Sequence, residues 1–237
     1  MTQLINSNFS YFFYSKNIIF NMKKIIKIIS IILLLISAIF INKDVNALLP
    51  LSGKIIIIDP GHGGKDPGTT SGNIHESEIN LAISKYLEIE LSKAGATVIL
   101  TRDGDYDLSS PNAKWRKKSD FDNRIKLINN SNGNMYLSIH LNYLSDNSYS
   151  GAQVFYNNEE NKIIATTIQN ELNKKLNNKR NIKKIPNKTY MYDKLKIPGV
   201  LIECGFLSNY KEKELLKSSN YQQKIANVIK DAIINYY

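Results

Sequence analysis

Short apolar runs rich in β-branched residues alternate along most of the chain with longer segments in which apolar positions recur every three or four residues. The short runs predict strands and the longer segments predict helices, because side chains repeat every two residues on a strand and every 3.6 on a helix. Strands are predicted at 54–59, 97–101, 135–139, 153–156 and 200–203, and helices at 78–94, 121–130, 161–176 and 221–236. The polar stretch 103–120 is predicted to be a loop. This alternation is typical of a single α/β domain with a largely parallel twisted sheet and helices on both faces.

A different pattern precedes the first strand. Lysines at 23–27 are followed by the apolar run 28–41 and then by the small-residue sequence Val-Asn-Ala at 45–47. This is the order of regions in a secretory signal peptide that is cleaved after Ala47. An uncleaved anchor that contacts the membrane is the alternative, although the run is shorter than the roughly 20 residues that a bilayer span needs. In both cases we expect 1–47 to direct a single domain, 48–237, to the outside of the cytoplasm, because the lysines stay inside.

The charge of the chain limits the kinds of molecule it can bind, and its cysteine content indicates the state of the thiol. The formal net charge is +10, and the part after residue 47 contributes +6 of it from 26 basic and 20 acidic residues. Apart from the stretch 174–184 this excess is scattered, so we expect no nucleic-acid binding, which requires a focused basic stripe. An anionic polymer such as a cell wall suits such a surface. The single cysteine, Cys204, lies in the apolar stretch 200–206, where a buried and inert thiol is expected.

Two of the three histidines follow predicted buried strands. His62 lies in the glycine-rich turn after strand 54–59, and His140 directly follows strand 135–139. Open α/β sheets place their ligands at the carboxyl ends of strands. We therefore expect the two imidazoles to meet at one edge of the sheet, where they could bind a metal ion.

A catalytic zinc ion needs three protein ligands and one open position for water. Glu76, where the first helix begins, is the best third ligand, because Gly63, Gly64 and Gly68 allow the intervening loop to fold back over the sheet edge. Glu78 and His75 are alternatives, and for His75 an exposed loop position is the simpler interpretation.

A carboxylate ends the apolar run 200–203. Glu203 would be costly to bury unless it were paired or held for a purpose. At the same sheet edge as the histidines it would face the water that zinc activates, take a proton from it and return that proton to a leaving amine. A structural acid held by a salt bridge or a helix cap is the alternative.

Four segments carry a resemblance to a known family: IIIIDPGHGGKDPG, ESEINLAISKYLEIELSKAGATVILTR, NRIKLINNSNGNMYLSIHLN and PGVLIECGFLSN. In this order they resemble the zinc-dependent N-acetylmuramoyl-L-alanine amidases, also called amidase type 3, over residues 54–237. The resemblance implies that His62, Glu76 and His140 are the zinc ligands and that Glu203 is the catalytic carboxylate. It also implies that the substrate is peptidoglycan, cut at the amide between the lactyl group of muramic acid and L-alanine of the stem peptide.

The compact form and the polar segment 115–120 resemble the spore-cortex, germination-specific subgroup of these amidases. This narrower resemblance implies a product that feeds muramic-δ-lactam formation during sporulation, in the cell wall or the forespore intermembrane space. A protein that recruits or activates the enzyme is also expected, since we recognise no wall-binding module. The alternatives are a zinc peptidase that cuts within the stem peptide and a catalytically inactive wall-binding module.

Overall fold

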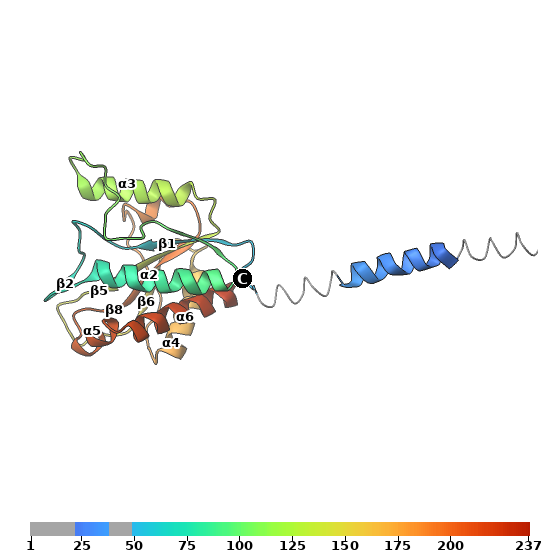
Figure 1. Ribbon diagram of the computed structural model, residues 1–237. Coiled ribbons are helices and arrows are strands. Elements are labelled where there is room, and N and C mark those ends of the chain that lie inside the picture. The colour runs from blue at the N-terminus through green and yellow to red at the C-terminus, as the bar shows by residue number, and fades with distance from the viewer. Residues whose placement is uncertain (1–21, 38–48) are drawn as a thin grey trace, which may run out of the picture. The chain divides into compact units, whose positions relative to one another are not determined.

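The computed structural model describes residues 22–37 and 49–237, which belong to two separate units divided after Leu48 (Figure 1). Residues 22–37 of the first unit form a helix. Among the residues described, none of the helices combines the length and the apolarity needed to cross a membrane. The predicted cleavage site at 45–47 and the end of the apolar run lie outside the described residues.

The second unit is built on one mixed sheet. Its strands, in the spatial order β4-β1-β5-β8-β6-β7, are β4 (Thr97–Leu100), β1 (Ile55–Pro60), β5 (Met135–Asn142), β8 (Gly199–Phe206), β6 (Gln153–Tyr156) and β7 (Lys183–Lys184). The first four are parallel to one another, β6 runs antiparallel to β8, and β7 is parallel to β6. A separate two-stranded sheet pairs β2 (Thr70–Ser71) with β3 (Ile74–His75).

Helices cover both faces of the main sheet, which confirms the predicted fold class (Figure 1). They are α2 (Glu76–Lys93), α3 (Arg116–Asn129), α4 (Lys162–Lys175), α5 (Tyr210–Leu216), α6 (Ser219–Tyr236) and the 3-10 helix η1 (Tyr192–Lys194). The larger core lies between the sheet and α2, α4 and α6, and the smaller core lies under α3 and η1. Strand β1 serves both cores, since Ile56 and Ile58 point into the larger one and Ile57 into the smaller one.

Three features differ from the sequence prediction. The stretch 103–120 is not entirely loop, because α3 already begins at Arg116. The first turn of α3 is polar, so it shows no apolar periodicity. Strand β8 continues beyond Glu203 to Phe206. The short elements β2, β3, β7 and α5 were not predicted, because segments this short hold too few positions to show a period. Cys204 is buried, as expected.

Candidate active site

The turn after β1 brings His62 to the sheet edge. The backbone N–H of Gly61 donates to Ile139 O at 2.9 Å, which extends the pairing of β1 and β5 past the end of the strand. His62 then adopts the left-handed conformation, with a φ of 62°, which is uncommon for a residue other than glycine. Position 68 requires glycine, because a Cβ there would lie 2.7 Å from the His62 ring and 2.7 Å from Glu76 Oε2. The predicted folding back of this loop is therefore present.

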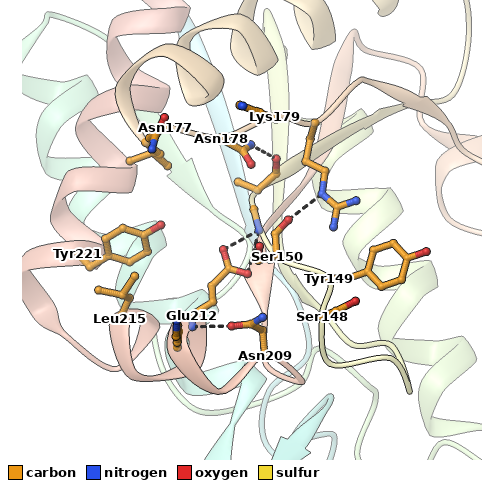
Figure 2. Close-up of a pocket in the computed structure, with 15 residues that line it drawn as sticks. Ser148, Tyr149, Ser150, Asn177, Asn178, Lys179, Asn209, Glu212, Leu215 and Tyr221 are labelled. Carbon is orange, nitrogen blue, oxygen red and sulfur yellow. Dashed lines mark hydrogen bonds between the residues drawn. The ribbon is translucent and has the colours of Figure 1, made fainter.

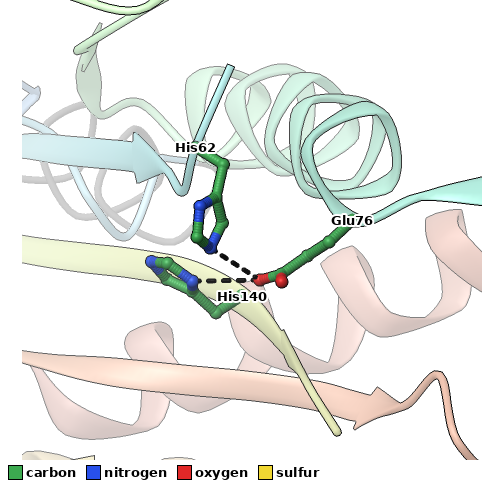
Figure 3. Close-up of side chains that lie close together, drawn as sticks. All are labelled: His62, Glu76 and His140. Atoms are coloured by element: carbon green, nitrogen blue, oxygen red, sulfur yellow. Dashed lines mark hydrogen bonds and ion pairs between the residues drawn. The ribbon is translucent and has the colours of Figure 1, made fainter. Parts of the chain in front are cut away.

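Three side chains that are far apart in the sequence converge at this edge (Figure 3). His62 Nε2 lies 3.3 Å and His140 Nδ1 lies 3.1 Å from the same carboxylate oxygen, Glu76 Oε1. Their ligand atoms all lie within 4.8 Å of one another. Two imidazole nitrogens and one carboxylate oxygen form a donor set that catalytic zinc sites use. The group can hold a metal ion.

Hydrogen bonds from neighbouring residues orient His62 and Glu76. His62 Nδ1 lies 2.9 Å from Asp66 Oδ2, so Nδ1 can carry the proton and leave the Nε2 lone pair directed at the centre. Glu76 Oε2 accepts from the backbone N–H of Thr69 at 2.9 Å, and Oε1 accepts from that of Leu141 at 3.0 Å. Although burial lowers it, the pKa of His62 is raised to about 9 by its hydrogen bonds to Asp66 and Glu76. The local field therefore favours a positive charge at the centre of the group.

The two alternative ligands lie outside this group. Glu78 is exposed on α2. His75 is half-buried and belongs to β3, so its interpretation as an exposed loop residue is wrong. The short β2–β3 hairpin explains this position, and His75 also precedes the first residue of α2 as its N-cap.

Glu203 lies beside the three donors, opposite His140 in the register of β5 and β8. It lines the same cavity, about 250 Å³ in volume, together with His62 and His140. Its Oε2 atom is buried and accepts no hydrogen bond from the described residues. Burial raises the pKa of Glu203 to about 7. A carboxyl group with this pKa can both accept and release a proton near neutral pH, as general acid–base catalysis requires.

A buried charge network that the sequence analysis missed supports the His62 turn. Arg124 of α3 donates from Nη1 to Asp59 Oδ1 at 2.8 Å, from Nε to Asp120 Oδ2 at 2.9 Å, and from Nη2 to the carbonyl of His62 at 2.7 Å. Arg102 holds the same turn through the carbonyls of Pro60 and Gly61. Burial raises the pKa of Asp59, but the charge and hydrogen bonds of Arg124 outweigh it and hold that pKa below the usual range. Asp59 precedes the turn directly, and its charge at the end of an apolar run was the one available sign of this network.

We expect Arg124→Met to destabilise the protein by about 3–5 kcal/mol, because it leaves two buried carboxylates without their cation. Urea unfolding at pH 7 measures this loss. A depressed pKa means that Asp59 contributes stability above its unfolded pKa, near 3.8, and that this contribution is lost as the pH falls through the lower folded pKa. The difference in the free energy of unfolding between the wild type and Arg124→Met should therefore become smaller below about pH 4.

Lys118→Met is the matched control. It removes a cation from the same helix, but the ion pair that Lys118 forms with Asp122 is exposed. It should change the unfolding midpoint little. Equal stability of Arg124→Met and the wild type would show that the network does not support the turn.

Comparisons with known proteins show which family this chain resembles. The family model for N-acetylmuramoyl-L-alanine amidase, Amidase_3, matches residues 56–235. The chain is 42% identical over 194 residues to the germination-specific N-acetylmuramoyl-L-alanine amidase of Bacillus subtilis, a match that covers 80% of this chain and 82% of that protein. It is 30% identical over 195 residues to the amidase LytC of the same organism, and that match covers 79% of this chain and 36% of LytC.

Solved structures share the fold. The CwlD amidase from Clostridioides difficile, in complex with the GerS lipoprotein, is 40% identical with a TM-score of 0.74, and the match covers 78% of this chain and 98% of that chain. The catalytic domain of the amidase CwlV from Bacillus (Paenibacillus) polymyxa is 28% identical with a TM-score of 0.68, and the match covers 77% of this chain and 97% of that chain.

Proposed function

The chain belongs to the Amidase_3 family of N-acetylmuramoyl-L-alanine amidases, and from this premise we propose that it is a zinc enzyme that modifies the peptidoglycan of the spore cortex. The bond cut is the amide between the lactyl group of muramic acid and L-alanine of the stem peptide. The observation that carries the proposal is the convergence of two imidazoles and one carboxylate beside Glu203, whose buried Oε2 atom accepts no hydrogen bond from the described residues.

His62, Glu76 and His140 would hold the zinc ion. Bound there, zinc supplies the Lewis acidity that activates water and polarises the substrate carbonyl. Asp66 keeps the His62 ring in the orientation that this binding needs. The chain's own residues thus provide all three donors for the metal ion.

Glu203 is the residue that moves the proton. Its carboxylate accepts a proton from the attacking water as the new C–O bond forms, and it delivers that proton to the alanine nitrogen as the C–N bond breaks. The products are a free lactyl carboxylate and a stem peptide with a free amino terminus. Burial favours this cycle, because the raised pKa of Glu203 keeps both protonation states accessible near neutral pH.

Mass spectrometry of muropeptides after digestion of purified peptidoglycan tests the proposal. An amidase releases the intact stem peptide and leaves unsubstituted muramic acid, and a chelator should stop this release until zinc is restored. A shortened stem would instead identify a peptidase that cuts within the stem peptide. Binding without any product would identify an inactive wall-binding module.

The place of action follows from the substrate. Peptidoglycan lies outside the cytoplasm, so we propose that this domain acts there, in the cell wall or between the forespore membranes. The germination-specific relative from Bacillus subtilis supports the cortex role. The segment 1–47 would act as the export signal or remain as a membrane anchor.

We further propose a protein partner that activates the enzyme, since the CwlD amidase from Clostridioides difficile is in complex with a lipoprotein. A partner that orders the loop leading to Glu76 would strengthen metal binding, because a site lacking one fixed ligand binds zinc weakly. The protein purified alone should therefore bind zinc weakly and cleave peptidoglycan slowly. Zinc titration and cleavage rates, with and without the corresponding lipoprotein, measure this. A protein that is already zinc-loaded and fast when purified alone would contradict the partner hypothesis.

A further inference from the structure

A groove of about 690 Å³ lies apart from the metal-binding group, and we call it the distal groove (Figure 2). The loop 148–152 forms one side of it. Residues 176–180 after α4, residues of α5 with its N-cap Asn209, and Tyr221 of α6 form the rest. None of the residues proposed for zinc binding or proton transfer contributes to its lining.

The charge of the distal groove is positive. Lys179 and Lys211 are exposed on its lining, and Arg180 adds a guanidinium group. The one acidic side chain in the lining is Glu212, whose carboxylate accepts the backbone N–H groups of Gly151 at 2.9 and 3.0 Å and of Phe206 at 2.8 Å. Because these bonds occupy the Glu212 carboxylate, the cations of the groove remain available to an anionic ligand.

Aromatic and amide groups accompany these cations. Tyr149 is 43% exposed, and its ring stacks on Phe206 with the centroids 6.2 Å apart. The guanidinium carbon of Arg180 lies 5.3 Å from the centroid of Tyr149 and holds that side of the groove in place. Asn177 and Asn178 add amide groups. A sugar ring has apolar C–H faces that suit an aromatic side chain and hydroxyl groups that suit amides.

The groove and the candidate active site lie at the same end of the sheet. Gln153 of β6 pairs with Glu203, and Gly151, two residues earlier, lines the groove. The loop from β5 to β6 therefore runs from the strand that carries His140 to the groove. Residues of α3 line the cavity at the metal-binding group, whereas residues that follow α4 and residues of α5 and α6 line the groove.

We propose that the distal groove binds a second stretch of peptidoglycan: the glycan packs on Tyr149, and carboxylates of neighbouring stem peptides pair with Lys179 and Lys211. This inference rests on the proposed function, because it takes the polymer as substrate. A strand held in the groove stays at the end of the sheet where cleavage occurs. The enzyme then remains on its insoluble substrate between cleavage events.

The test measures binding of the full chain, kept in mild detergent, to sedimented peptidoglycan. The double variant Lys179→Glu/Lys211→Glu should weaken binding about tenfold or more, because like charges then face the stem carboxylates. Wild-type binding should also weaken with added salt. The control is Lys174→Glu/Lys175→Glu, which makes the same change in net charge on exposed positions of α4 outside the groove and should bind as the wild type does.

Tyr149→Ala distinguishes the contribution of the sugar to binding from that of the stem peptide. It should weaken binding both to intact peptidoglycan and to glycan strands whose stem peptides have been removed, whereas the lysine variant should affect mainly the intact polymer. Circular dichroism confirms that each variant is folded. Binding is measured without turnover, so failure of the groove is distinct from failure of the amidase activity. If the lysine and tyrosine variants bind both polymers as the control does, or lose only a protein partner, the proposal is overturned.

Discussion

Replacing His140 by alanine should remove zinc from the protein and reduce amidase activity to near the background rate. With zinc added, the wild type should bind up to about one ion per chain and the variant almost none, because the variant keeps only two of the three ligands. Losing a residue that merely orients a ligand typically costs 10–100-fold in metal affinity, so losing a ligand should cost more than about 100-fold. Zinc titration and the rate of hydrolysis of purified peptidoglycan measure the two effects.

His75→Ala is the matched control for this experiment. It removes the third histidine, which lies in β3 directly before Glu76 but outside the group of converging donors. This variant should keep its zinc, and near-ultraviolet circular dichroism should show that both variants are folded. Wild-type zinc affinity in His140→Ala, or loss of zinc in a folded His75→Ala, would show that the ligand set is wrong.

Replacing Glu203 by glutamine should preserve zinc and fold while slowing hydrolysis by about 10²–10⁴-fold, the range that general acid–base groups contribute. The amide keeps the shape of the side chain but cannot accept the proton of the attacking water. Activity near the wild-type level in a zinc-loaded Glu203→Gln would remove this residue from the mechanism.

The same variant has a second readout that is independent of turnover. Burial raises the folded pKa of Glu203 from 4.5 to about 7, so ionisation opposes folding. This penalty grows as the pH rises from the unfolded pKa and is complete above the folded pKa. Metal-free Glu203→Gln should therefore melt at a higher temperature than the metal-free wild type at pH 8, with little difference near pH 4. A lower melting temperature at pH 8 would mean that the carboxylate is favourably paired.

The pattern of apolar residues was enough to predict the sheet and its main helices, because each long element shows its own period. It also placed His62 and His140 at one sheet edge, since parallel neighbours end at the same edge. The prediction of Glu76 as a ligand also required that the loop before it fold back, and the glycine at position 68 was the local indication of that fold. These expectations used only short segments of sequence.

The rest depends on contacts that no local pattern contains. Arg124 and Asp59 are separated by 65 positions, and although Asp59 is a charge at the end of an apolar run, no local pattern identifies Arg124 as its partner. The distal groove likewise combines a loop, the residues that follow one helix and residues of two others. The antiparallel direction of β6 depends on where the loop after β5 turns, and the four residues of β6 show a strand but not its orientation.

The donors lie after β1, on α2 and on β5, and this arrangement determines when the protein can bind zinc. His62 and His140 meet only after β1 has paired with β5, which the chain supplies about 80 residues later. An unfolded chain therefore contains no assembled zinc site, and metal binding becomes part of the free energy of folding. A chain exported in the unfolded state would collect its zinc only on the far side of the membrane, so the metal supply of that compartment would set how much active enzyme exists there.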